Sequence, residues 1–238
     1  MSEQQAAQPF MEEPSFWSAV WSIMRKDLRI ERRTGQTIGI MVMFSLVTVI
    51  MFNFALGSNL GAARELSTGL LWATILLAGT LGLNRSLAIE REQQTFDALL
   101  IAPVRRNAIY LGKVASITLF TFVLELILVV VFVVFFNKPF WRPQVIAILA
   151  LGTFGYIAAG VLVTSMSIQT RSRDVLLPVL LLPLSLPLVL PASLATSAYM
   201  FPELPTWGEV QSAVYLVLLY DLLMVITGLF FYHYVVES

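Results

Sequence analysis

The stretch Asn84–Lys113, NRSLAIEREQQTFDALLIAPVRRNAIYLGK, carries eight charged residues between two long apolar runs. A polar segment between two apolar ones stays in water while its neighbours are buried, so the contrast predicts a water-facing loop. At helical spacing, one side of a short helix in this loop is apolar: Phe96, Leu99, Leu100 and Pro103. Pro103 lacks a backbone donor, so we expect this helix to end there and a new one to begin near Asn107. Such a face suits docking onto another protein, and a solvated loop folding back on the membrane surface is the alternative.

The composition of the whole chain is that of an integral membrane protein. The 238 residues are 58% hydrophobic with a mean hydropathy of +0.80, more apolar surface than one soluble core buries. The chain has no Cys and one His, which excludes disulfides and thiolate metal sites, and we expect no metal site and no nucleic-acid partner. Residues 1–15 contain no Lys or Arg and no apolar core, so they predict a disordered cytosolic tail and not a secretory signal.

Residues 16–36, FWSAVWSIMRKDLRIERRTGQ, have the pattern of an amphipathic helix. Phe16, Trp17, Val20, Ile23 and Met24 share one side, and the other side is basic: Arg25, Lys26, Arg29, Arg32 and Arg33. The pattern predicts an interfacial helix on an anionic inner leaflet. Asp27 and Glu31 lie one turn apart on the apolar side. We expect them either to pair with Arg side chains of Asn84–Lys113 or to lie at the surface.

Six apolar segments, each near the roughly 20 residues that span a hydrocarbon core, follow within residues 16–238. They are Thr37–Gly57, Thr68–Ile89, Val114–Phe136, Gln144–Ile168, Val175–Ala192 and Ser212–Val236. With the N-terminus inside, twelve of the fifteen Lys and Arg residues are cytosolic, so the positive-inside rule predicts a multi-pass protein with both termini in the cytosol. The fourth span has small residues at helical spacing and predicts a packed interior helix.

The fifth span, within residues 175–201, contains Pro178, Pro183, Pro187 and Pro191. Prolines at this spacing kink or break a helix. We therefore expect a kinked span that ends at Ala192 and is followed by a short re-entrant piece, Ser193–Phe201.

The sequence lacks the motifs of an enzyme. No G-x-x-x-x-G-K-[ST] occurs, so any ATP must be hydrolysed by another chain, and no nucleophile elbow or His-Glu metal motif is present. Glu125 and Asp221 fall inside predicted spans, where charge is costly. They either line a polar route or are neutral acids hydrogen-bonded between helices.

Several segments resemble the ABC-2 type permeases, and among these the CcmB-type subunit of the cytochrome c maturation haem exporter. The resemblance rests on Lys26-Asp27-Leu28 with Glu31, on LLAGTLGLNRSLAIEREQ from Leu76, on LLIAPVRR from Leu99, and on LLPLSLPLVLPA from Leu181. It implies an all-α, polytopic ABC-2 permease fold of six transmembrane helices, with an N-terminal interfacial helix and a cytosolic coupling helix in residues 84–113. The residues it implies as contacts of the ATPase subunit are Glu90, Arg91, Thr95, Phe96, Leu99, Leu100 and Pro103.

The resemblance also implies partners and a location. It implies a CcmA-type ATPase subunit that binds the ATP, CcmC-like and CcmD-like membrane subunits, a CcmE-like haem chaperone, and a dimer of permease subunits in the bacterial inner membrane. Haem would be moved by the complex, or its loaded chaperone released, with no cofactor bound directly by this chain. Two alternatives stay open: an ABC-2 exporter of lipid, polysaccharide or drug, and a proton-coupled secondary carrier or channel that uses Glu125 and Asp221.

Overall fold

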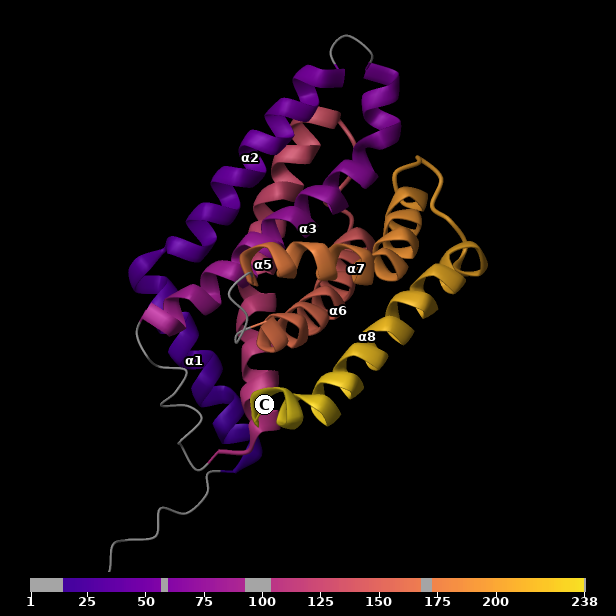
Figure 1. Ribbon diagram of the computed structural model, residues 1–238. Helices are drawn as coiled ribbons and strands as arrows, with labels where there is room; N and C mark the ends of the chain where they lie inside the picture. Colours follow the sequence, from indigo (N-terminus) through magenta and orange to yellow (C-terminus); the bar gives the residue numbers. More distant parts are fainter. Residues whose placement is uncertain (1–14, 57–59, 93–103, 168–172, 238) are drawn as a thin grey trace, which may run out of the picture.

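The computed structural model describes residues 15–56, 60–92, 104–167 and 173–237. The regular structure of these residues is helical, and no strand occurs among them (Figure 1). Labelled as in Figure 1, the helices are α1 (Phe16–Thr34), α2 (Gln36–Leu56), α3 (Leu60–Glu92), α5 (Arg106–Phe136), α6 (Pro143–Ser167), α7 (Arg173–Ala198) and α8 (Trp207–Glu237).

Six of these helices, α2, α3, α5, α6, α7 and α8, are long and apolar enough to cross a membrane. In a bilayer each backbone polar group needs an internal partner, which a continuous helix supplies. The predicted fold class, an all-α polytopic membrane protein, is therefore confirmed. The helix expected near Asn107 is also confirmed, since α5 begins at Arg106, well before the predicted start of the third span at Val114.

The junction between α1 and α2 is a single residue, Gly35. Its φ of 58° is left-handed, a conformation that glycine adopts without steric cost, and its N–H donates to the Glu31 carbonyl at 2.7 Å. The chain thus leaves α1 and enters α2 at Gln36 with no loop between them. This short junction fixes where α1 lies relative to the first span.

The apolar side of α1 packs against protein. Ala19 and Ile23 are buried, whereas Trp17 and Trp21 are 71% and 59% exposed. At Gly112 of α5 an added Cβ would lie 2.8 Å from the Ile23 Cβ and 3.2 Å from the Val20 carbonyl oxygen, so the absence of a side chain lets the two helices approach closely. The predicted helix is confirmed over Phe16–Thr34, but its Ile23 side is occupied by α5.

The predicted interior position of the fourth span is confirmed, because α6 has the most buried span in the described chain, at 72%. Its glycines receive large side chains: an added Cβ would lie 2.4 Å from the Trp72 ring at Gly152 and 2.3 Å from the Leu83 side chain at Gly160. Small residues of this kind let neighbouring helices pack tightly where no hydrophobic effect drives association.

Hydrogen bonds from aromatic side chains tie the neighbouring helices together. The Tyr156 hydroxyl of α6 donates to the Leu76 carbonyl of α3 at 2.8 Å, and the Trp72 Nε1 of α3 donates to the Thr196 hydroxyl of α7 at 3.2 Å. The Tyr110 hydroxyl of α5 donates to the Ala158 carbonyl of α6 at 3.1 Å, while its ring contacts that of Tyr232 of α8. The start of α5 and the end of α8 therefore lie side by side, as Figure 1 also shows.

The proline-rich helix α7 is continuous over Arg173–Ala198 and includes all four prolines. The predicted end of the fifth span at Ala192 is wrong, because α7 continues to Ala198. Figure 1 shows the ribbon of α7 changing direction before it reaches the loop to α8, as kinking prolines require. The re-entrant character of residues 193–201 stays a prediction.

The glycine at position 152 provides a test of the packing. We expect Gly152→Ala to destabilise the bundle by about 1–3 kcal/mol, because the indole that would have to move is rigid and buried. The control Gly69→Ala has nothing within 4 Å of its added Cβ and should be neutral or slightly stabilising. Unfolding midpoints in mixed micelles measure both, and equal midpoints for the two variants would contradict the assigned packing.

Candidate functional site

A buried ion pair joins α1 to the start of α5. The Asp27 Oδ2 lies 2.8 Å from the Lys113 Nζ, and the two side chains are 7% and 4% exposed. The Ser116 hydroxyl donates to the same Oδ2 at 2.9 Å, and the Lys26 Nζ lies 3.2 Å from Oδ1. Both carboxylate oxygens thus have charged or polar partners, the arrangement in which a buried carboxylate is tolerated.

The protonation state of Asp27 follows from these neighbours. Burial raises the pKa of the Asp27 carboxyl, but the charges of Lys113 and Lys26 and the hydrogen bonds from Lys113 and Ser116 outweigh burial and leave the pKa below its ordinary value. Asp27 is therefore ionised at neutral pH, and the link between α1 and α5 is a true ion pair.

The second acid of α1, Glu31, caps the first span. Its Oε1 accepts the Ile38 N–H at 2.8 Å and its Oε2 accepts the Thr37 N–H at 3.2 Å. Both donors lie in the first turn of α2, where helical N–H groups lack intrahelical partners and a negative charge is favourable. Glu31 therefore holds α2 to α1 across the Gly35 junction.

The expectation that Asp27 and Glu31 pair with Arg side chains of Asn84–Lys113 is wrong, because neither acid has an arginine partner among the described residues. Asp27 pairs with a lysine of that stretch, Lys113, and Glu31 with backbone N–H groups. The reason is geometric, because Lys113 lies two turns inside α5, on the face that packs against α1. Arg85 instead donates to the Gln36 side chain at the start of α2.

These contacts meet at one place, which we call the α1 joint: Asp27, Glu31, Thr37, Lys113 and Ser116. A crevice of about 20 Å³ beside it is lined by residues of α1, α2, α3 and α5, among them Ser86, Ile89 and Phe120. This volume is enough for about one water molecule. The joint therefore bonds α1 to the start of α5 and lies beside the end of α3, and these last two helices bracket residues 93–103.

The predicted ATPase-contact residues lie at and beyond the end of α3. Glu90 and Arg91 belong to its last turn. Thr95, Phe96, Leu99, Leu100 and Pro103 lie outside the described residues. The docking role of all seven stays a prediction.

The basic residues of α1 lie mainly on its solvent side. Arg25, Arg29, Arg32 and Arg33 are exposed, whereas Lys26 is half-buried beside Asp27. Trp17 and Trp21 share the exposed side with them.

The two intramembrane acids are buried, as expected for carboxyl groups inside spans. Glu125 of α5 is 1% exposed and accepts a hydrogen bond from the Thr153 hydroxyl of α6. Asp221 of α8 is 6% exposed and packs on α6 at Gly155. The structure brings both acids to α6, but not to each other and not to the α1 joint.

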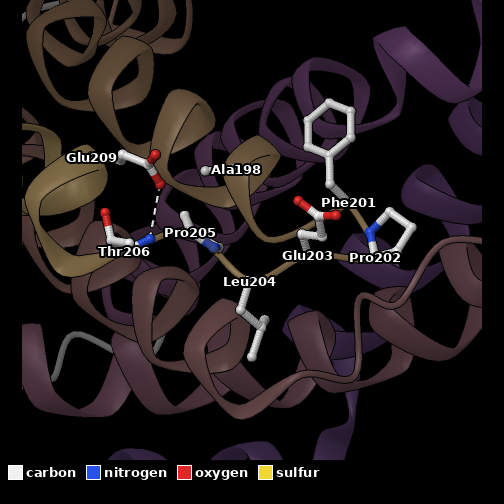
Figure 2. A pocket seen from close by; sticks show the side chains of 8 residues that line it. All are labelled: Ala198, Phe201, Pro202, Glu203, Leu204, Pro205, Thr206 and Glu209. Carbon is white, nitrogen blue, oxygen red and sulfur yellow. Dashed lines mark hydrogen bonds between the residues drawn. The ribbon is translucent and has the colours of Figure 1, made fainter.

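A larger pocket lies on the loop between α7 and α8, with a volume of about 700 Å³. Figure 2 shows Phe201, Glu203 and Leu204 on one part of its wall and Glu209 on another. Glu209 accepts the Thr206 N–H at 2.8 Å and so caps α8. One of the two carboxylates of this pocket thus has a structural role.

These features define a class of protein: a polytopic helical membrane protein whose polar stretch between two spans is tied back onto an amphipathic helix. Among the described residues no group of His, Cys, Asp or Glu side chains could hold a metal ion. The chain belongs to the CcmB protein family, whose sequence model matches residues 18–230. The resemblance found in the sequence is thereby confirmed.

Individual relatives match between two fifths and two thirds of the chain. Heme exporter protein B of Rhodobacter capsulatus is 27% identical over 166 residues, which covers 68% of this chain and 75% of that protein. Heme exporter protein B of Paracoccus denitrificans is 27% identical over 164 residues, with the same coverage. Heme exporter protein B of Escherichia coli K12 is 29% identical over 96 residues, 40% of this chain and 44% of that protein.

Lys113 and Ser116 are the residues that sequence reasoning missed. A signal was present, because Lys113 recurs at four-residue spacing with Ile109, Ile117 and Thr121, all on the buried face of α5. A lysine on a buried helix face requires an acidic partner, and Asp27 on the apolar side of α1 requires a basic one.

Removing one partner of the ion pair should lower the free energy of unfolding more than replacing both partners with apolar residues. We expect Lys113→Met to destabilise the protein by about 3–5 kcal/mol, because Asp27 is left buried without its main counter-charge. The double variant Asp27→Leu with Lys113→Met should recover most of this loss. Unfolding in mixed micelles measures both, and a double variant less stable than Lys113→Met would contradict the assignment.

The lowered pKa of Asp27 sets the pH dependence of its contribution. A carboxyl whose pKa falls on folding stabilises the folded state above its ordinary value of 3.8, and this contribution is lost as the pH falls through the lowered pKa. The difference in unfolding free energy between wild type and Asp27→Asn should therefore stay constant from about pH 7 to about pH 4 and shrink below that. A difference that already vanishes near neutral pH would show that Asp27 is not ionised.

Proposed function

We propose that this chain is the permease subunit of an ABC-type complex that handles haem in the bacterial inner membrane. The observation that carries the proposal is membership of the CcmB family, with relatives named Heme exporter protein B. The absence of a nucleotide-binding motif from the sequence supports a separate ATPase subunit of the CcmA type. This chain is then a non-catalytic partner that receives the motion of the ATPase.

The proposed route of that motion begins at residues 93–103. Phe96, Leu99, Leu100 and Pro103 dock into the ATPase subunit, with Glu90, Arg91 and Thr95 beside them. The segment is bracketed by α3 and α5; α5 is bonded to α1 at the α1 joint, and the end of α3 lines the crevice beside it. A push on the segment is therefore carried by α5 and α1 as one unit, because the Asp27–Lys113 pair and the close contact at Gly112 prevent α5 from sliding along α1.

The proposed orientation has both termini in the cytosol. Six candidate spans between α1 and the end of α8 return the chain to its starting side, and the Lys and Arg distribution favours the cytosol for that side. The exposed arginines of α1 then face the anionic headgroups of the inner leaflet, with Trp17 and Trp21 at the level of the headgroups.

The proposed assembly contains a CcmA-type ATPase, CcmC-like and CcmD-like membrane subunits and two copies of the permease. ATP hydrolysis would drive export of haem or release of a haem-loaded CcmE-like chaperone. This chain binds no cofactor of its own in the proposal, and the haem is the cargo of the complex.

The docking role of residues 93–103 is tested by charge insertion. We expect Phe96→Asp or Leu99→Asp to abolish co-purification of the ATPase subunit while the six-helix bundle stays folded, because a carboxylate in an apolar contact is left desolvated and unpaired. The control Leu204→Asp places the same charge on the exposed loop between α7 and α8 and should leave co-purification unchanged.

The control also guards against a general effect of added charge. Retention of the ATPase subunit by both Phe96→Asp and Leu99→Asp would refute the docking assignment. Loss of the ATPase subunit with all three variants would show that added charge destabilises the complex in general, and it would also remove the support for the docking assignment.

A further inference from the structure

Two buried carboxyl groups flank α6 at one level of the bundle. Glu125 of α5 lies against Thr153, whose hydroxyl donates to its Oε1. Asp221 of α8 lies so close to Gly155 that an added Cβ would be 1.8 Å from its Oδ1. Thr153 and Gly155 are two positions apart in α6, which corresponds to about 200° of rotation around the helix axis and about 3 Å of rise along it. The carboxyls therefore contact nearly opposite sides of α6 at the same depth.

Among the side chains that the structure describes, none supplies a compensating charge to either carboxyl. The Glu125 Oε2 and both Asp221 oxygens are buried without a hydrogen-bond partner. Within the described part of the chain, the ion pairs of acidic side chains all involve Asp27, so no Lys, Arg or His pairs with either group. The contrast with Asp27, which has two ammonium groups and a hydroxyl, is complete.

The ionisable groups of the surrounding helices are few and occupied. The span of α6 contributes Tyr156, whose hydroxyl is bound to Thr80 and to the Leu76 carbonyl. On α8, Tyr220 is next to Asp221, and its hydroxyl donates to the Leu184 carbonyl at 3.1 Å. The other ionisable groups of this span, Glu209, Tyr215 and Tyr232, are at least about 9 Å along the helix from Asp221. On α5 the nearest cation along the helix, Lys113, is twelve residues from Glu125, about 18 Å away, and is paired with Asp27.

The other neighbours add no charge at this level. The spans of α2 and α7 contain no ionisable side chain, and that of α3 contains Arg85 near its end, where the side chain donates to Gln36. An ionised carboxylate without a partner costs several kcal/mol in such surroundings, and a proton removes this cost.

We propose that Glu125 and Asp221 each hold a proton in this conformation, and that the pair makes the position of α6 between α5 and α8 depend on protons. A movement of α6 that admits water to either side breaks the O–H bond of that carboxyl, transfers the proton to water and leaves a carboxylate. Returning α6 to its original position would then bury an ionised carboxylate, which costs free energy. The inference does not depend on the proposed haem function, because it rests on the contacts of α5, α6 and α8 alone.

The protonation states can be read by infrared spectroscopy of the full chain in lipid nanodiscs at neutral pH. The carbonyl stretch of a protonated carboxyl group is separate from the carboxylate bands. We expect Glu125→Gln and Asp221→Asn each to remove one protonated-carboxyl band, and Asp27→Asn to remove none. No loss of such a band with Glu125→Gln and Asp221→Asn would overturn the proposal.

A threonine pair provides a matched control for the Glu125 band. Thr153→Val removes the hydroxyl that donates to Glu125 and should shift that band. Thr121→Val removes a hydroxyl one turn from Glu125 on α5 that donates to the Ile117 carbonyl, and should leave the band in place. A shift with Thr121→Val and none with Thr153→Val would contradict the assigned geometry.

Stability against pH tests the dependence on protons. Because the folded arrangement buries the protonated forms, raising the pH should lower the unfolding midpoint of wild type more than that of the double variant Glu125→Gln with Asp221→Asn. Glu125→Gln should also be far milder than Glu125→Lys, since an amide resembles a neutral acid. Identical pH profiles for wild type and the double variant, or equal loss from Gln and Lys, would overturn the proposal.

Discussion

The ion pair between Asp27 and Lys113 is the interaction on which the arrangement of α1, α2 and α5 depends. Neither charge is tolerated alone in its buried position, so the two helices hold each other in one register. Gly112 lets the two helices approach, and the Ser116 hydroxyl donates to the same carboxylate oxygen of Asp27 that Lys113 contacts. Glu31 accepts hydrogen bonds from the first turn of α2 and so fixes α2 against α1. The amphipathic helix α1 is thereby fixed to the helical bundle.

The bundle handles its buried acids in two different ways. At the α1 joint the acid is ionised and surrounded by donors, which makes the contact strong and directional. Around α6 the acids Glu125 and Asp221 have no counter-charge from the described side chains, and small residues such as Gly155 bring the helices close. The α1 joint is rigid and lies near the polar stretch, whereas α6 in the interior forms no ion pair with the described residues. This difference fits a protein that receives motion at the joint and changes the position of α6 in response.

Much of this arrangement could be predicted from the sequence, because hydropathy and charge alone determine the six spans and the helix over Phe16–Thr34. The interior position of α6 followed from its glycines. The partner of Asp27 could not be predicted with the same reasoning, since Lys113 was counted with a polar loop, whereas packing against α1 buries it in a helix. The end of α7 was placed too early because proline lowers helix propensity locally, while tertiary packing sustains the helix to Ala198.

In the proposed mechanism, motion enters the chain through residues 93–103, on the side where the basic face of α1 lies. Because the chain has no native cysteine, a single Leu100→Cys variant can be labelled without background. In vesicles of known sidedness, we expect a membrane-impermeant thiol reagent to react with this cysteine from the cytosolic side, and we expect the ATPase subunit to shield it. Labelling from the opposite side of the membrane, unaffected by the ATPase subunit, would contradict the account.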